Sequence, residues 1–236
     1  MTRAIPATKG PRMSILLSRG LAALSFALAA GVAGAAQIQL YETGPAEDAS
    51  FVRFVNAGAE PMAVSAKGSQ ARIQLDAAHP ASDFMPVKAG AKMQGLLESA
   101  GRKQEVDISV QPGEFASVVG LPGKDGLQAR IVREQPEDFN ALKVSVGFYN
   151  LDPACADAGL LAVPRNLAMF EHVAEGAVAR RLVNPVSLKV RASCGGQPAG
   201  QELDLGALQA GDRHTVFLLP SAQGPRLLHA ADQTAR

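Results

Sequence analysis

Two stretches of this chain, Gln104–Val132 and Gln201–His229, have similar sequences. In each, Gln-Glu-x-Asp-x is followed by a tight turn with glycine, an apolar run, Leu-Pro and a closing run. Alternating apolar residues predict strands with one buried face, and glycine suits a hairpin turn. The copies are offset by 97 residues at the first block and 98 from the turn onward. That period matches one small domain rather than a solenoid unit, so we expect two related β-domains in tandem.

The rest of the chain extends this pattern to an all-β fold of two β-sandwich-like domains. Residues 37–135 contain about seven short strand-like segments separated by turn residues, a density typical of a β-sandwich. A charged, proline-containing and aperiodic segment predicts a linker at residues 136–140. The second domain is then 141–236, and Leu142–Asn150 restarts the pattern of Phe51–Asn56, because both segments end in an apolar residue followed by Asn.

Two segments have weaker patterns. Leu167–Leu182 is rich in residues that favour a helix, but Gly176 interrupts it and the surrounding pattern is β, so we expect a loop or a short strand. The polar residues after Ala230 are expected to fray.

Residues 1–36 have the features of a signal peptide. Four basic residues precede the apolar stretch Leu21–Val32, which is too short to span a bilayer, and Ala33–Ala36 offers small residues for cleavage near Ala35 or Ala36. A retained anchor is the alternative. Cleavage would leave 19 basic and 22 acidic residues, a net charge of −3, which argues against a nucleic-acid partner.

Cys155 and Cys194 are the only cysteines, and both fall in the second predicted domain. An even pair in an exported domain predicts a disulfide, which would stabilise that domain by about 4 kcal/mol on the chain-entropy model. Their wide separation excludes a CxxC-type redox site, and two free thiols are the alternative.

Part of the first domain resembles a known family. Leu40-Tyr41 before a Gly-Pro turn, Ser50–Ala57, and Ala81–Phe84 with Pro86 soon after are similar to AlgF-like proteins of alginate O-acetylation, which also occur in systems that acetylate other exopolysaccharides such as cellulose. The resemblance covers Leu40–Pro86 most strongly, and over the second domain it rests on layout.

The resemblance implies a non-catalytic, periplasmic adaptor in exopolysaccharide O-acetylation, without a cofactor. Its implied partners are a periplasmic SGNH-type O-acetyltransferase and the membrane acyltransferase machinery. Ser82, Asp83 and Phe84 are the candidate partner contact because they lie in the matching segment. A buried structural role for Phe84 is an equal alternative.

The sequence offers little for catalysis or metal binding. Asp76-Ala77-Ala78-His79 fits the Asp-x-x-His block of the SGNH-type transferases, but the Gly-Asp at Gly211-Asp212 is followed by Arg rather than Ser. An isolated match to a short pattern favours coincidence, so we predict no catalytic residues. We interpret Glu171-His172 and Arg213-His214 as solvent-facing. No two histidines stand at ligand spacing, so we predict no metal site.

A polysaccharide-binding module is the alternative function. The chain has no Trp and two Tyr, so an aromatic sugar platform has little support, and the nine Phe fall mostly in apolar strands. The basic doublets Arg180-Arg181 and Arg102-Lys103 are the other candidates for binding an acidic polymer, although such doublets are usually solvated.

Overall fold

The computed structural model describes residues 49–135 and 140–235, which form strands, turns and loops. The predicted signal peptide, the strand start at 37–40 and all of the predicted linker except Asn140 lie outside the described residues. Among the described residues, no helix is long and apolar enough to cross a membrane.

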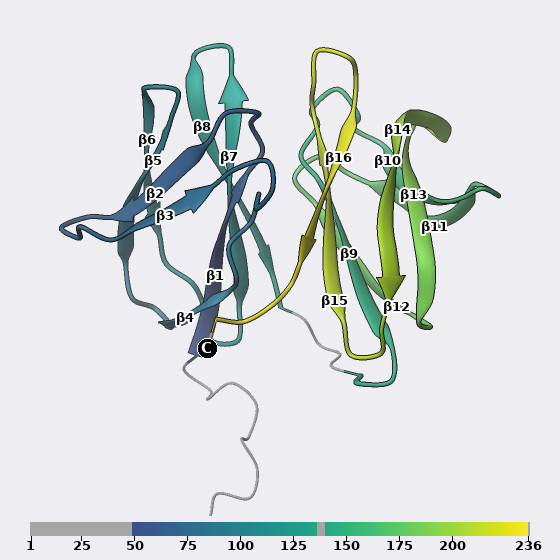
Figure 1. Cartoon of the computed structure of the whole chain (residues 1–236), viewed down its shortest axis with the longest axis horizontal. Helices are drawn as coiled ribbons and strands as arrows, with labels where there is room; N and C mark the ends of the chain where they lie inside the picture. The colour runs from purple at the N-terminus through teal and green to yellow at the C-terminus, as the bar shows by residue number, and fades with distance from the viewer. Residues whose placement is uncertain (1–48, 136–139, 236) are drawn as a thin grey trace, which may run out of the picture. The chain divides into compact units, whose positions relative to one another are not determined.

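The described part contains two β-sandwiches with the same strand order (Figure 1). The strands of the first are β1 (Ala49–Asn56), β2 (Met62–Ala66), β3 (Arg72–Leu75), β4 (Met85–Lys88), β5 (Met93–Ser99), β6 (Arg102–Ile108), β7 (Phe115–Gly123) and β8 (Gly126–Glu134). Those of the second are β9 (Val144–Asn150), β10 (Ala158–Val163), β11 (Leu167–Val173), β12 (Val178–Val183), β13 (Val186–Cys194), β14 (Gln197–Leu208), β15 (Arg213–Leu219) and β16 (Arg226–Ala231). The predicted all-β class and the two sandwiches are confirmed.

Each sandwich consists of two four-stranded sheets. The orders β4-β1-β7-β8 and β3-β2-β5-β6 in the first match β12-β9-β15-β16 and β11-β10-β13-β14 in the second. The register also repeats: Asn56 lies opposite Gly120 in the parallel β1–β7 pair, and Asn150 lies opposite Leu218 in the parallel β9–β15 pair. Equivalent residues are therefore 94 apart in β1 and β9 and 98 apart in β7 and β15.

The glycine turn predicted from the repeated sequence has the same structure in both sandwiches. Gly113 and Gly211 have φ values of 73° and 87°, a left-handed conformation that glycine adopts without strain. The next residue accepts a hydrogen bond from the backbone N–H three positions earlier, through Oε2 of Glu114 and Oδ2 of Asp212. The repeated turn is thus fixed by both glycine and a side-chain acceptor.

A buried asparagine ends the first strand of each sandwich. Nδ2 of Asn56 donates to the carbonyl oxygens of Glu60 and Leu75, and its Oδ1 accepts from the N–H of Gly58. Asn150 donates equivalently to Cys155 and Val173, and accepts from Asp152. Each asparagine therefore joins the end of β1 or β9 to the end of β3 or β11 and to the following turn.

Of the two weaker predictions, the strand alternative for Leu167–Leu182 is confirmed, as two strands rather than one, and the frayed tail is wrong. Leu167–Leu182 forms most of the two strands β11 and β12, with Gly176 in the turn between them at a φ of 79°. The segment after Ala230 is not frayed, because Ala231 ends β16 and Thr234 forms a parallel bridge with Phe84. Figure 1 shows this yellow segment running from β16 to the end of β4.

The predicted disulfide is confirmed. Cys155 and Cys194 are bonded, with their Cα atoms 5.3 Å apart, and they join the loop after β9 to the end of β13. A disulfide is consistent with an exported protein.

We predict that Asn56→Ala and Asn150→Ala each lower the free energy of unfolding by about 1–3 kcal/mol, because each leaves two carbonyls and one N–H without partners. Denaturant unfolding of both variants measures this. Asn184→Ala is the matched control: Asn184 is exposed and accepts one hydrogen bond from Lys143, so its loss should cost under about 0.5 kcal/mol. Losses as small as the control's in both variants would contradict the proposed role.

Candidate functional site

The outer faces of two sheets, β4-β1-β7-β8 and β12-β9-β15-β16, bury a third apolar cluster besides the two sandwich cores. Its ten buried residues form five pairs at equivalent positions of the two sandwiches: Val55 and Tyr149, Ala57 and Leu151, Val119 and Phe217, Leu121 and Leu219, Val132 and Ala230. We call this cluster the interface core. It explains why every residue of β9 is buried, although a strand on the surface of a sandwich normally buries one face.

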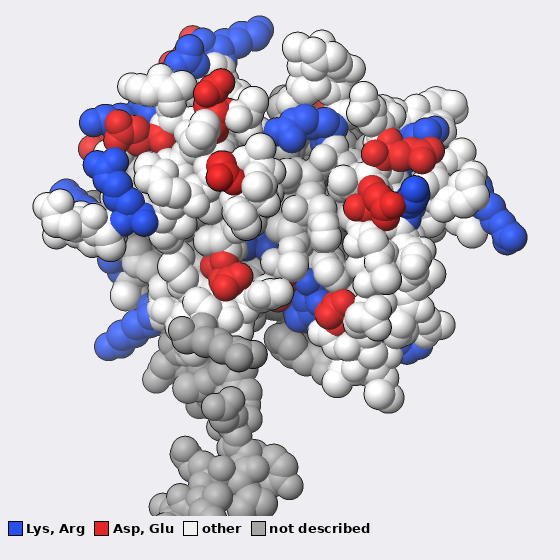
Figure 2. Space-filling model, in the orientation of Figure 1, with Lys and Arg blue, Asp and Glu red and all other residues white. Residues whose placement is uncertain are grey.

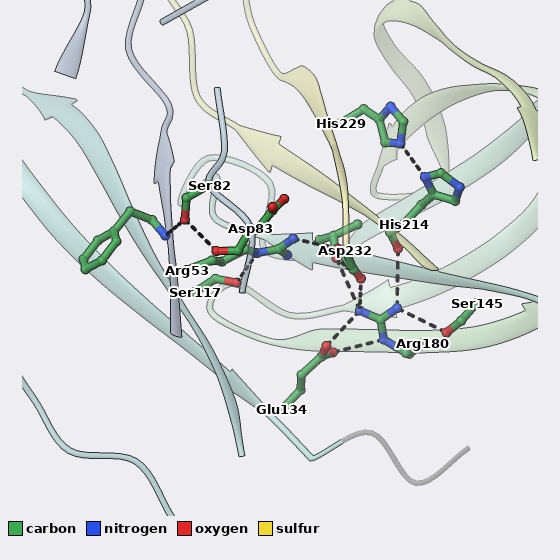
Figure 3. A network of polar contacts seen from close by, with 12 residues as sticks. Arg53, Ser82, Asp83, Ser117, Glu134, Ser145, Arg180, His214, His229 and Asp232 are labelled. Carbon is green, nitrogen blue, oxygen red and sulfur yellow. Dashed lines mark hydrogen bonds and ion pairs between the residues drawn. The ribbon is translucent and has the colours of Figure 1, made fainter. Parts of the chain in front are cut away.

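Arg53 lies on the same outer face of β1 as Val55 and is completely buried. Its Nη1 donates to Oδ1 of Asp232 at 2.6 Å, and its Nε donates to Oγ of Ser117 at 2.8 Å (Figure 3). The guanidinium lies 4.3 Å from the ring centre of Phe84 and 5.3 Å from that of Phe217, distances typical of cation–π contacts. Among the described residues, Nη2 of Arg53 has no hydrogen-bond partner.

Arg180 brings a second cation to this interface from β12. Its guanidinium contacts both Glu134 oxygens, at 2.8 and 3.2 Å, and Oδ2 of Asp232 at 3.0 Å. A Cβ at position 147 would lie 2.7 Å from Nη2 of Arg180, so Gly147 leaves the room that this side chain needs. Burial alone would lower the pKa of Arg180, but the attraction of Asp232 and Glu134 raises it by more, so the net pKa lies above its ordinary value.

The two acids occupy equivalent positions, because Glu134 and Asp232 are 98 residues apart, Glu134 as the last residue of β8 and Asp232 directly after β16. The two arginines do not occupy equivalent positions. The equivalent of Arg53 is Gly147, and the strand pairing makes Phe84 the equivalent of Arg180. Each arginine nevertheless pairs with the acid of the other sandwich. The interface thus combines a symmetric apolar cluster with ion pairs that cross between the sandwiches.

Asp232 links both cations. Besides Arg53 and Arg180, it accepts a hydrogen bond from Oγ1 of Thr215 at 2.7 Å. Burial would raise the pKa of Asp232, but the two arginines and Thr215 outweigh it, so the net pKa lies below the usual 3.8. The carboxylate therefore stabilises the fold above pH 3.8, and this contribution is lost as the pH falls further.

The predicted partner contact lies beside this network. Phe84 is 2% exposed, its N–H donates to the carbonyl of Gln233, and its own carbonyl accepts from the N–H of Ala235. Oγ of Ser82 accepts from the N–H of Phe54. The buried role considered for Phe84 is therefore the one in this structure, where its edge pairs with the chain's own C-terminal segment. Asp83 is the exposed residue of the three.

Two histidines that the sequence kept apart meet at this end of the second sandwich. Nδ1 of His214 lies 2.9 Å from Nε2 of His229, so at least one of these two ring nitrogens is unprotonated (Figure 3). The His214 side chain is 11% exposed, which contradicts the predicted solvent-facing position. Burial, and to a smaller extent His214, lowers the pKa of His229 to about 4.

The other histidines behave as the sequence predicted. His172 is 84% exposed and lies 3.0 Å from Asp157. The His79 side chain is 85% exposed, and its ring lies 3.8 Å from Asp76, whose Oδ1 accepts hydrogen bonds from the N–H groups of Ala78 and His79. These bonds make Asp76 the acceptor of a turn. Within the described ranges, no three metal-ligating side chains form a group that could hold an ion.

A groove of about 820 Å³ beside the interface core is lined by loop and strand residues of both sandwiches. Asn56, Asp76, Gln201 and Gln223 line it, and Arg226 crosses it to donate a hydrogen bond to the carbonyl of Ala57. Its lining offers amides and charged groups but no aromatic ring.

The basic doublets were the other predicted polymer contacts. Arg180 is held in the buried ion pairs, which contradicts a solvated position for this residue. Arg181 is exposed and donates to the carbonyl of Met169. Arg102 and Lys103 are exposed on β6.

Sequence reasoning missed the interface. The signals present were the polar or small residues within otherwise apolar strands, Arg53 in β1 and Ser145 and Gly147 in β9. Polar residues on one face of a strand normally indicate a solvated face, and here they mark the face that meets the other sandwich.

No family model matches the chain, and no curated protein matches its sequence. Among solved structures, the crystal structure of a candidate cell adhesion protein from Bacteroides ovatus aligns with 81% of this chain and 100% of its own, at 9% identity and a TM-score of 0.28. At that score the likeness does not inform the function.

We predict that Arg53→Met lowers the free energy of unfolding by about 3–5 kcal/mol, because it leaves a buried carboxylate with one cation fewer. Asp232→Ala should cost as much, and the double variant should cost less than the two losses combined. Lys189→Met is the control, because the Lys189–Asp204 pair is exposed and should contribute under about 1 kcal/mol. Strictly additive losses in the double-mutant cycle would show that Arg53 and Asp232 are not coupled.

We also predict that stability falls by about 1–2 kcal/mol between pH 7 and pH 5, because the unfolded chain protonates His229 near its ordinary pKa while the folded chain does not until about pH 4. His229→Gln should flatten this dependence, and His79→Gln should not, since His79 is exposed. Unfolding at each pH provides the measurement. Identical slopes for the His229 variant and the unmutated protein would refute the assignment.

Proposed function

We propose that this chain is a non-catalytic, periplasmic adaptor that links the components of an exopolysaccharide O-acetylation machine, the polymer being alginate or a similar one such as cellulose. The observation that carries the proposal is the interface between the sandwiches. An adaptor needs its binding faces at fixed positions, and a buried apolar cluster with crossed ion pairs holds two modules more firmly than a flexible linker does.

The family resemblance and the interface involve the same residues. Within Ser50–Ala57, Arg53 forms the buried ion pair, while Val55 and Ala57 belong to the interface core. Asn56 fixes the end of β1, and Phe84, in the matching segment Ala81–Phe84, packs on Arg53. Residues of the motif thus serve the joining of two sandwiches, which supports a scaffold role for proteins that share it.

The partners proposed are the periplasmic SGNH-type O-acetyltransferase and the membrane acyltransferase. Asp83 is the residue of the predicted contact that a partner can reach, and it lies next to the edge that the C-terminal segment occupies. The proposed contact is therefore an exposed carboxylate on a rigid support, which suits a basic patch on the partner.

The immobilised protein should retain the SGNH-type transferase from a periplasmic extract and the acyltransferase from detergent-solubilised membranes of the same cells. We predict that Asp83→Ala weakens retention of whichever of these two proteins contacts Asp83 by about tenfold. A loss of this size is typical for one important interface residue. Asp204→Ala is the control, since Asp204 is an exposed acid on the second sandwich. If the immobilised protein retains neither the transferase nor the acyltransferase, the adaptor function is refuted. A stable acetyl-protein that forms with an activated acetyl donor and is lost in His79→Ala would refute it too.

Polysaccharide binding is the second candidate, and the groove beside Asn56 and Gln201 favours it. Amide and charged side chains that line a groove of about 820 Å³ suit sugar hydroxyls, although no ring is present to stack on a sugar face. Micromolar binding of purified exopolysaccharide that Gln201→Ala weakens, in the absence of any partner protein, would favour this function over the adaptor.

A further inference from the structure

The first sandwich has an apolar groove of about 410 Å³ at the edge where β3 and β4 end its two sheets. Its lining includes Phe54 of β1, Ile73 of β3, Met85 and Val87 of β4, and Gly95 of β5. Phe54, Ile73 and Val87 pack against the core of this sandwich and yet remain partly exposed. The volume lies within the range of about 300–1,000 Å³ that small-molecule sites occupy.

The second sandwich has larger side chains at two equivalent positions. The strand pairings make Phe170 the equivalent of Ile73, and Val190 the equivalent of Gly95. Phe170 is 7% exposed and Val190 is completely buried, and both belong to the core of the second sandwich. The groove therefore lies where the first sandwich has a smaller side chain than the same fold can accommodate.

Phe54 lacks the aromatic neighbour that its equivalent has. Phe148 is the equivalent of Phe54, and its ring stacks on that of Phe170 with the ring centres 5.9 Å apart and the planes 19° apart. Within the described ranges Phe54 pairs with no aromatic ring, because Ile73 takes the position of Phe170. The Phe54 ring thus lies in the lining of the groove without a stacked partner.

The two edge strands are also joined differently. Residues 174–177 connect β11 to β12, whereas the longer segment of residues 76–84 connects β3 to β4. Arg181, the equivalent of Met85, donates to the carbonyl of Met169 and so ties β12 to β11. A methionine side chain has no hydrogen to donate, so Met85 cannot form this link. The edge is closed in the second sandwich and open in the first.

The charges around the groove balance one another. Arg72, which is part of the lining, lies 3.9 Å from Glu98. Gln94, also part of the lining, accepts a hydrogen bond from Lys67 and donates one to Asp107. Figure 2 shows basic and acidic side chains interspersed on the face of the first sandwich in view. Since neither sign predominates, an uncharged ligand suits this apolar groove better than an ion does.

We propose that this groove binds a small, uncharged aromatic molecule, whose ring stacks on Phe54 as that of Phe170 stacks on Phe148 in the second sandwich. The space that Ile73 and Gly95 leave open admits the ring. The proposal is independent of the adaptor function, because neither the interface core nor the predicted partner contact at residues 82–84 lines the groove.

Fluorescence titration of the purified protein with the uncharged probe N-phenyl-1-naphthylamine tests the proposal, with 2-phenylethanol and 2-cyclohexylethanol as competitors. We expect micromolar binding of the probe. The aromatic alcohol should displace it at a concentration about threefold or more below that of the saturated one, because a stacked ring contact adds to the burial of apolar surface. Burial alone would favour the saturated alcohol, which is the more apolar of the two.

Ile73→Phe places the ring of the second sandwich in the groove. It should weaken binding of the probe about tenfold or more, because a packed side chain excludes the ligand. Ile131→Phe is its control, because Ile131 is a partly exposed residue of β8 and does not line the groove.

Phe54→Leu keeps the proposal testable if Ile73→Phe does not fold. It should abolish the preference for 2-phenylethanol. Phe51→Leu should retain that preference, because Phe51 is a partly exposed residue of the same strand that stacks on Phe115 outside the groove.

Absence of probe binding by the unmutated protein would overturn the proposal, and so would displacement by 2-cyclohexylethanol that equals or exceeds that by 2-phenylethanol. Unchanged affinity in a folded Ile73→Phe variant, or an unchanged preference in Phe54→Leu, would overturn it too. A dimer in size-exclusion chromatography that Ile73→Phe dissociates would assign the groove to a second copy of the chain instead.

Discussion

Burial of the Arg53 charge is the constraint on which the arrangement of the two sandwiches depends. A guanidinium with no exposure is tolerated only where an anion and further hydrogen bonds replace its hydration, and the first sandwich does not supply that anion. Asp232 supplies it from the other sandwich, and Ser117, Phe84 and Phe217 surround the remaining faces of the group. A strand with an arginine at this position therefore requires the second sandwich.

Duplication accounts for most of the interface, and divergence accounts for its specificity. Five pairs of equivalent apolar residues bring together two copies of the same sheet face, in the way that a twofold homodimer uses one patch twice. The cations break the equivalence, because one comes from β1 and the other from β12, next to Gly147. Apolar contact then supplies the attraction, while the crossed charges define one relative placement, a role that buried polar groups have in other proteins.

The sequence was sufficient for the fold and insufficient for the interface, for identifiable physical reasons. Alternation in Val186–Cys194 and the repeated glycine turns at Gly113 and Gly211 report local geometry, and local geometry determines strands and hairpins. The His214–His229 contact arises from strand pairing, which residue types alone do not reveal. Arg53 and Arg180 look like surface cations when taken singly, because the acids that make their burial favourable, Asp232 and Glu134, are distant in the sequence.

The C-terminal segment has a consequence for the order in which the molecule is completed. Arg53 and Asp232 are 179 residues apart, and the pairing of Phe84 with Gln233 and Ala235 also depends on the last residues of the chain. During synthesis the first half emerges before these residues exist, so its β1 face carries an uncompensated cation and a bare apolar surface until the end of the chain arrives. The joining of the two sandwiches is therefore a late step, which follows the formation of the first sandwich.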